Sequence, residues 1–88
     1  MRITVKYFAR VRESLGPGED LAFPEGQAAT PATVGALREW LAARSSTHAA
    51  ALGPQQALRT ALDQAMCGPH EPLCDGAEVA FFPPVTGG

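Results

Sequence analysis

The sequence has no long apolar run and no cluster of positive charge. Its 88 residues carry 7 Lys and Arg against 9 Asp and Glu, a formal net charge of −2 at pH 7. The sequence has no basic stripe that could follow a phosphate backbone, so nucleic acid is not expected as a partner. A mildly acidic surface suits a basic protein partner. No stretch approaches the roughly 20 apolar residues that span a bilayer, and residues 1–5 lack signal-peptide features. These absences predict a cytoplasmic protein that binds no membrane.

Residues that ligate metals or form disulfides are also scarce. Cys67 and Cys74 are the only cysteines, and their separation fits no short metal-binding or redox motif. Thiols in the cytosol are normally reduced, which leaves their role open. His48 and His70 stand alone in polar, turn-like segments. The sequence therefore predicts no metal site and no acid, base or nucleophile among its side chains.

The first residues alternate between apolar and polar side chains. Arg2–Phe8 is rich in strand formers and predicts a strand. Ile3, Val5 and Tyr7 share one face, which we assign to the core. Phe8 is then an apolar residue at the end of the otherwise polar opposite face.

The central part of the chain predicts one main helix. Thr33 is a suitable N-cap, and Val34, Leu37 and Leu41 recur at the spacing of a buried helix face. Gly35 costs such a helix about 1 kcal/mol relative to Ala, a loss that close packing can justify. The other elements expected from local patterns are a short helix at Ala9–Leu15, a strand at Glu19–Phe23 that pairs antiparallel with the first, and a last strand at Glu78–Phe82.

The segment from Ala49 to Met66 has two interpretations. Ser45–His48 is expected to end the main helix, and the alanines and apolar spacing that follow favour another helix by propensity. The alternative is a strand at Leu58–Leu62, a tight turn at Asp63–Gln64 and a short strand at Ala65–Met66. Local signals favour the helix.

The last eight residues read Phe-Phe-Pro-Pro-Val-Thr-Gly-Gly (81–88). Proline cannot donate a ladder hydrogen bond, so Pro83 and Pro84 end the last strand and keep the chain extended. Gly87 and Gly88 lack a Cβ and can thread a narrow channel. A terminal Gly-Gly arises by chance in only about half a percent of chains, so this ending is unusual.

This ending, with the opening Val5–Glu13 and Thr33-Val34 before Leu37-Arg38, resembles the MoaD/ThiS family of ubiquitin-like β-grasp sulfur carriers. Within the family it looks like the small subunits of molybdopterin synthase. The resemblance implies an α+β, ubiquitin-like β-grasp domain over residues 1–82, with a mixed sheet of about four to five strands packed on one main helix, and a flexible tail over residues 83–88. It also favours the strand interpretation of the segment that ends at Met66.

The resemblance implies that the C-terminal carboxylate is the reactive group. A ubiquitin-activating-type enzyme would use ATP to adenylate Gly88, and sulfur from a persulfide donor would convert it to a thiocarboxylate. In the large subunit of molybdopterin synthase, within an expected heterotetramer, that sulfur would pass to cyclic pyranopterin monophosphate to form the molybdopterin dithiolene. The chain would bind no cofactor itself and would not be catalytic alone.

The resemblance also implies which residues meet the partners. Pro83, Pro84, Val85, Thr86 and Gly87 would thread the tail toward the partner's active site. In a β-grasp sheet the first and last strands lie side by side and parallel, so Phe8 and Phe82 would emerge together on the face away from the helix. Met66 would join them in a partner interface. The other interpretation of these three side chains is a second, minor core.

Other functions remain open at this point. A sulfur carrier of this kind could serve thiamine synthesis, transfer-RNA thiolation or cysteine synthesis. A ubiquitin-like modifier would instead be conjugated to other proteins through Gly88.

Overall fold

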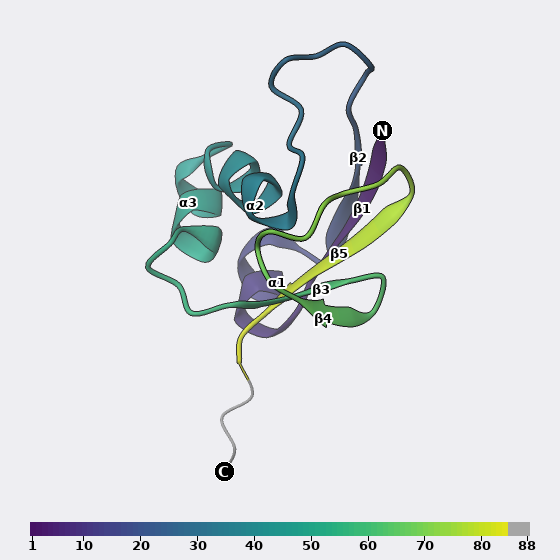
Figure 1. The fold of residues 1–88 in the computed structure, drawn as a ribbon. Helices are drawn as coiled ribbons and strands as arrows, with labels where there is room; N and C mark the ends of the chain where they lie inside the picture. The colour runs from purple at the N-terminus through teal and green to yellow at the C-terminus, as the bar shows by residue number, and fades with distance from the viewer. Residues whose placement is uncertain (85–88) are drawn as a thin grey trace.

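The structure, a computed structural model, describes residues 1–84, so Val85, Thr86, Gly87 and Gly88 lie outside the described residues. Within this range five strands form one mixed sheet in the order β2-β1-β5-β3-β4. Helices α2 and α3 lie to one side of the sheet (Figure 1). The elements are β1 (Arg2–Tyr7), α1 (Ala9–Leu15), β2 (Gly18–Ala22), α2 (Val34–Ala42), α3 (Ser46–Leu52), β3 (Arg59–Leu62), β4 (Ala65–Cys67) and β5 (Ala77–Phe82).

The two central strands, β1 and β5, run parallel in register, with Val5 opposite Val79 and Tyr7 opposite Phe81. β2 and β3 flank them in antiparallel pairs. Alternate residues of both central strands are buried, which confirms the predicted core face. The fully buried side chains of the core are those of Ile3, Val5, Tyr7, Val11, Val34, Leu37, Leu41, Leu52, Val79 and Phe81.

Helix α2 begins as the sequence predicts. The Thr33 hydroxyl accepts a hydrogen bond from the Ala36 amide at 3.1 Å, and the predicted apolar stripe is buried. Gly35 packs against Pro69, and a Cβ built on Gly35 would lie 2.9 Å from the Pro69 Cβ and 3.0 Å from its carbonyl oxygen. The glycine is therefore required by the close approach of this loop to the helix.

The structure corrects the prediction that Ser45–His48 ends the main helix. Helix α2 already ends at Ala42, and Ser45 starts a further helix, α3, by accepting a hydrogen bond from the His48 amide at 3.1 Å. Serine is a helix-initiating residue at this position, and Leu52 secures α3 by its burial in the core. The main helix α2 is therefore accompanied by two shorter helices, α1 and α3.

The strand interpretation of the following segment is confirmed. β3 and β4 form a hairpin whose turn residues, Asp63 and Gln64, have φ values of 49° and 69°. Two left-handed residues are typical of the type I′ turn that matches strand twist. Asp63 also binds β5, because its amide donates to the Glu78 carbonyl at 2.8 Å and its Oδ1 accepts from the Glu78 amide at 2.9 Å.

Across residues 1–84, no helix has the length and apolar character needed to cross a membrane. Both cysteines are free thiols, with Cys67 half-buried and Cys74 exposed.

Candidate functional site

Phe8 is held by its backbone at the point where β1 turns into α1. Its amide donates to the Phe81 carbonyl of β5 at 3.2 Å, and its own carbonyl accepts from the Val11 amide at 3.2 Å. The strand-to-helix turn places Ala9 at φ 53°. Phe8 is therefore fixed on both sides, and the residue is 43% exposed.

The ring of Phe8 meets the ring of Phe82 edge to face, with centroids 6.4 Å apart and planes at 87°. On the opposite face of the sheet Tyr7 stacks on Phe81, also at 6.4 Å between centroids. The two parallel strands thus end in two aromatic pairs, one in the core and one on the outer face. This confirms the predicted meeting of Phe8 and Phe82 on the face away from the main helix.

Met66 lies on the same outer face two strands away. The register places Met66 opposite Ala61 and Ala61 opposite Ala80, and at about 4.8 Å per strand this puts Met66 roughly 10 Å from β5. Met66 is 58% exposed, and among residues 1–84 it and Phe8 are the exposed large apolar side chains. We call the surface formed by Phe8, Met66, Ala80 and Phe82, with the buried Ala61 between the strands, the outer patch.

The tail leaves the domain at the edge of the outer patch. Phe82 is the last residue of β5 to pair, opposite Arg59 of β3, and Pro83 and Pro84 follow half-buried. Because proline has no N–H, the hydrogen-bond ladder between β5 and β3 cannot continue past Phe82. Of the predicted tail residues, Val85, Thr86, Gly87 and Gly88 lie outside the described residues, and their roles stay predictions.

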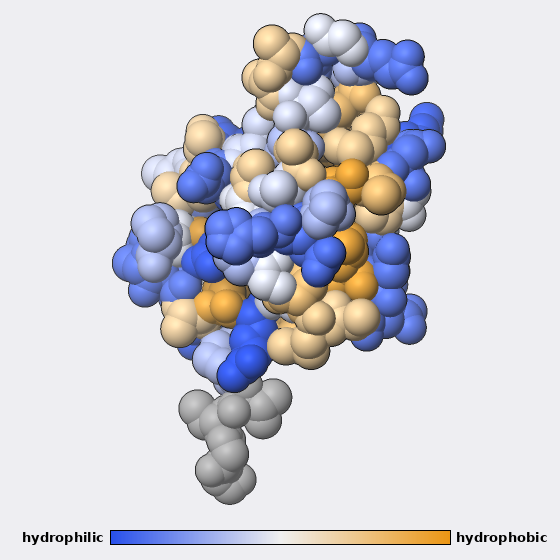
Figure 2. Space-filling model, viewed as in Figure 1, coloured by the Kyte–Doolittle hydropathy of each residue, from blue (hydrophilic) through white to orange (hydrophobic). Residues whose placement is uncertain are grey.

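A groove of about 350 Å³ lies beside this tail root. Pro84 lines it together with residues of β3, β4 and the loops next to them: Ala57, Leu58, Arg59, Thr60, Met66, Cys67 and Pro69. In the view of Figure 2, apolar residues gather beside β3 and β4 and are flanked by hydrophilic ones. The groove is continuous with the outer patch, since Met66 belongs to both.

Arg38 fixes the chain that leads into the groove. From helix α2 its guanidinium donates to the carbonyls of Leu52 at 2.6 Å, Gly53 at 2.7 Å and Gln56 at 2.8 Å. Burial lowers the pKa of Arg38 from its usual value. These bonds hold the C-terminal end of α3 and the segment 53–56 that leads to Ala57. The sequence pattern places Arg38 off the buried stripe but does not reveal these long-range partners.

A polar network joins the sheet to the end of helix α2. Tyr7 donates to Glu19 Oε2 at 3.1 Å, and Glu19 pairs with Arg44. Burial, reinforced by the charge of Glu19 and this hydrogen bond, raises the pKa of Tyr7. Arg44 also lies 5.2 Å from the centre of the Trp40 ring. The tyrosine is fully buried, so the network has a structural role.

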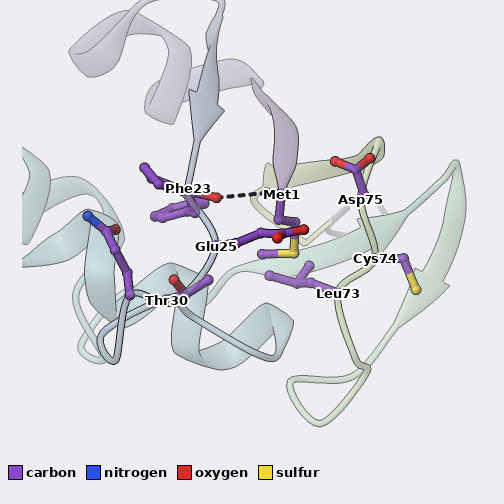
Figure 3. Close-up of a pocket in the computed structure, with 10 residues that line it drawn as sticks. Met1, Phe23, Glu25, Thr30, Leu73, Cys74 and Asp75 are labelled. Carbon is purple, nitrogen blue, oxygen red and sulfur yellow. Dashed lines mark hydrogen bonds between the residues drawn. The ribbon is translucent and has the colours of Figure 1, made fainter.

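A second hollow, of about 450 Å³, lies at the opposite end of β1 and β5 (Figure 3). Two of its polar groups are already engaged: the Met1 ammonium donates to the Phe23 carbonyl at 2.7 Å, and Asp75 accepts from the Arg2 amide at 2.7 Å. Cys74 points away from Met1 in this view. Within residues 1–84 no three His, Cys, Asp or Glu side chains gather as a metal site would need.

Comparisons with known proteins agree with this arrangement. The sequence model of the ThiS family matches residues 5–88. A protein of Escherichia coli (strain K12) described as a molybdopterin synthase sulfur carrier subunit is 45% identical, with 98% of this chain and 99% of the relative covered. A Haemophilus influenzae protein with the same description is 37% identical over the same shares.

Solved structures show the same fold. SAMP1 from Haloferax volcanii superimposes with a TM-score of 0.71 at 23% identity over the whole of both chains. A chain from a complex of subunits 1 and 2 of the molybdopterin-converting factor of Helicobacter pylori does so with a TM-score of 0.66 at 22% identity, again over both whole chains. The resemblance inferred from the sequence and the ubiquitin-like β-grasp fold that it implied are both confirmed. With a family model that matches almost its entire length and curated relatives that share its span, the chain belongs to the ThiS family.

Proposed function

We propose that this chain is the sulfur-carrier subunit of a molybdopterin synthase. The observation that carries the proposal is an aromatic pair on the outer face, the exposed Phe8 and the half-exposed Phe82, beside the root of a Gly-Gly tail. The 45% identity to the E. coli sulfur carrier subunit supports the choice of reaction. The chain does not act as an enzyme alone; it works with a partner subunit, which supplies the catalytic groups.

The chemistry starts at Gly88. An adenylating partner joins the Gly88 carboxylate to the α-phosphate of ATP and releases pyrophosphate, because a carboxylate is a poor electrophile until it becomes a mixed anhydride. The terminal sulfur of a persulfide donor then displaces AMP and forms an acyl disulfide. A thiol cleaves its S–S bond, which releases the Gly88 thiocarboxylate and leaves a disulfide between that thiol and the donor. The nucleotide belongs to the partner, this chain binds no cofactor, and a cytoplasmic location supplies the ATP.

The thiocarboxylate next enters the large subunit and gives its sulfur to cyclic pyranopterin monophosphate. Two such transfers build the dithiolene. The outer patch, with Phe8, Phe82 and Met66 as its large side chains, is the surface on which the large subunit docks. The two prolines stiffen the tail root and lower the ordering cost when Val85, Thr86 and Gly87 lead Gly88 into the active site.

The experiment that tests the proposal combines the thiocarboxylated chain with purified large subunit and cyclic pyranopterin monophosphate, and measures molybdopterin as its fluorescent oxidised derivative. Product in proportion to the carrier supplied is expected. A chain that accepts sulfur but yields no molybdopterin would serve thiamine, transfer-RNA or cysteine synthesis instead. Transfer of Gly88 to protein lysines in the same mixture would identify a protein modifier.

A further inference from the structure

The charge at the root of the tail is opposite in sign to the charge of the whole chain. The formal net charge is −2, yet Arg59 projects on the outer face directly opposite Phe82 in the register of β3 and β5. Among residues 1–84 the ion pairs within 4 Å are Lys6 with Glu78 and Arg44 with Glu19, and Arg59 belongs to neither. The net charge of the chain therefore does not predict the charge of a partner that docks at the tail end of the sheet.

Arg59 stands where the outer patch and the groove meet. It shares a strand face with Ala61, whose partner across the hairpin is Met66, so Arg59 and Met66 are diagonal neighbours roughly 7 Å apart. Both line the 350 Å³ groove together with Pro84. Arg59 is exposed, and most of the residues that line the groove with it are apolar.

A second cation borders the same region. Arg10 of α1 donates to the Ala57 carbonyl at 3.4 Å, and Ala57 lines the groove. Glu78, the acidic residue of β5, lies four residues from Phe82 and faces Lys6 at 3.0 Å. A partner that covers the outer patch therefore meets two arginines near the start of β3.

We propose that an acidic side chain of the large subunit enters this groove and pairs with Arg59 when the outer patch is covered. This inference rests on the proposed function, because that function supplies the partner. Docking would remove Arg59 from water, and a buried guanidinium requires a carboxylate to compensate its lost hydration. The planar guanidinium favours a bidentate pair with a carboxylate, so Arg59 acts as a specificity-determining residue that selects large subunits with an acidic group at this position.

The test compares two charge reversals that change the net charge equally, from −2 to about −4. Arg59→Glu alters the groove, whereas the control Arg2→Glu alters the same sheet face at the far end of β1. Affinity for the purified large subunit is measured by titration calorimetry at low and high salt. Arg59→Glu should bind roughly tenfold or more weakly at low salt, while Arg2→Glu stays within about twofold of the unaltered chain.

Further measurements exclude a folding defect. Both variants should keep the circular dichroism spectrum and thermal midpoint of the unaltered chain, since both arginines are exposed. Arg59→Leu should bind with a weaker dependence on salt than the unaltered chain. A Glu→Lys or Asp→Lys replacement in the large subunit that restores binding to Arg59→Glu would identify the carboxylate.

The outcomes separate this inference from the proposed function. If the unaltered chain binds and Arg59→Glu binds as well as Arg2→Glu, the Arg59 pair is overturned while the proposed function stands. If the unaltered chain neither binds the large subunit nor supports molybdopterin formation, both fall. A selective, salt-sensitive loss in Arg59→Glu supports the pair.

Discussion

The ring of Phe8 lies edge-on to the ring of Phe82, with 6.4 Å between their centroids. One residue follows the first strand and the other ends the last strand, and they meet because β1 and β5 are parallel and in register. The next residue after Phe82 starts the tail. In the proposed function, this pair marks both the surface for a partner and the origin of the reactive end.

Phe82→Asp should weaken binding to the large subunit by about 2 kcal/mol or more, because a central aromatic anchor would be replaced by a charge that docking must bury. Phe82 is half-exposed, so the thermal midpoint should change little. The control Ala22→Asp places the same charge on the same sheet face at the far end. Calorimetric affinities that are equal for both variants would remove Phe82 from the docking surface.

Arg38→Met should lower the free energy of unfolding by about 2 kcal/mol, because three carbonyl groups lose a charged donor. Arg38→Lys should recover only part of that stability, since an ammonium cannot reproduce the planar fork. Urea denaturation of the three proteins measures the difference. Unfolding free energies that match across the series would show that these bonds do not secure the end of α3.

Gly35→Ala has two opposing effects. Helix propensity favours Ala by about 1 kcal/mol, but the new methyl group would lie 2.9 Å from the Pro69 Cβ and 3.0 Å from its carbonyl oxygen. The carbonyl is backbone and accepts from the Gly35 amide at 2.8 Å, so it cannot move cheaply. We expect net destabilisation by about 1–3 kcal/mol. A higher thermal midpoint for this variant would contradict the packing argument.

Tyr7 should make the fold sensitive to alkali. Burial, then the charge and hydrogen bond of Glu19, raise the pKa of Tyr7 above its ordinary value of about 10. The folded chain holds this proton more tightly than the unfolded chain, so the stabilisation is complete below about pH 10 and is lost as pH rises toward the raised pKa.

Tyr7 is the only tyrosine, so ultraviolet absorbance follows its ionisation directly. Tyr7→Phe should lose less stability between neutral and alkaline pH than the unaltered chain. Ionisation of the folded chain at the ordinary tyrosine pKa would refute the predicted shift.

Much of this fold can be predicted from the sequence because its signals are local. Strand alternation indicates the core face of β1, and the same parity places Phe8 on the outer face. The Thr33 cap marks the start of α2 for a similar reason, since a cap depends on only a few neighbouring residues.

The sequence predictions are wrong or incomplete where contacts between residues distant in sequence determine the structure. Ser45 is compatible with a helix end, although serine also begins helices, and only the burial of Leu52 distinguishes the two. Whether Arg59 faces the outer patch depends on the register of β3 against β5, which no local pattern encodes. The three acceptors of Arg38 come from a segment that is distant in sequence.

The central claim is that Gly88 carries the sulfur, and the most direct measurement is intact mass. The chain would be incubated with ATP, the adenylating enzyme and a persulfide donor, beside a variant with one residue added after Gly88. We predict a gain of about 16 Da, the replacement of one oxygen by sulfur, in the unaltered chain and none in the extended variant. No gain in the unaltered chain, with a carrier-activating enzyme that is active on another substrate, would contradict the account.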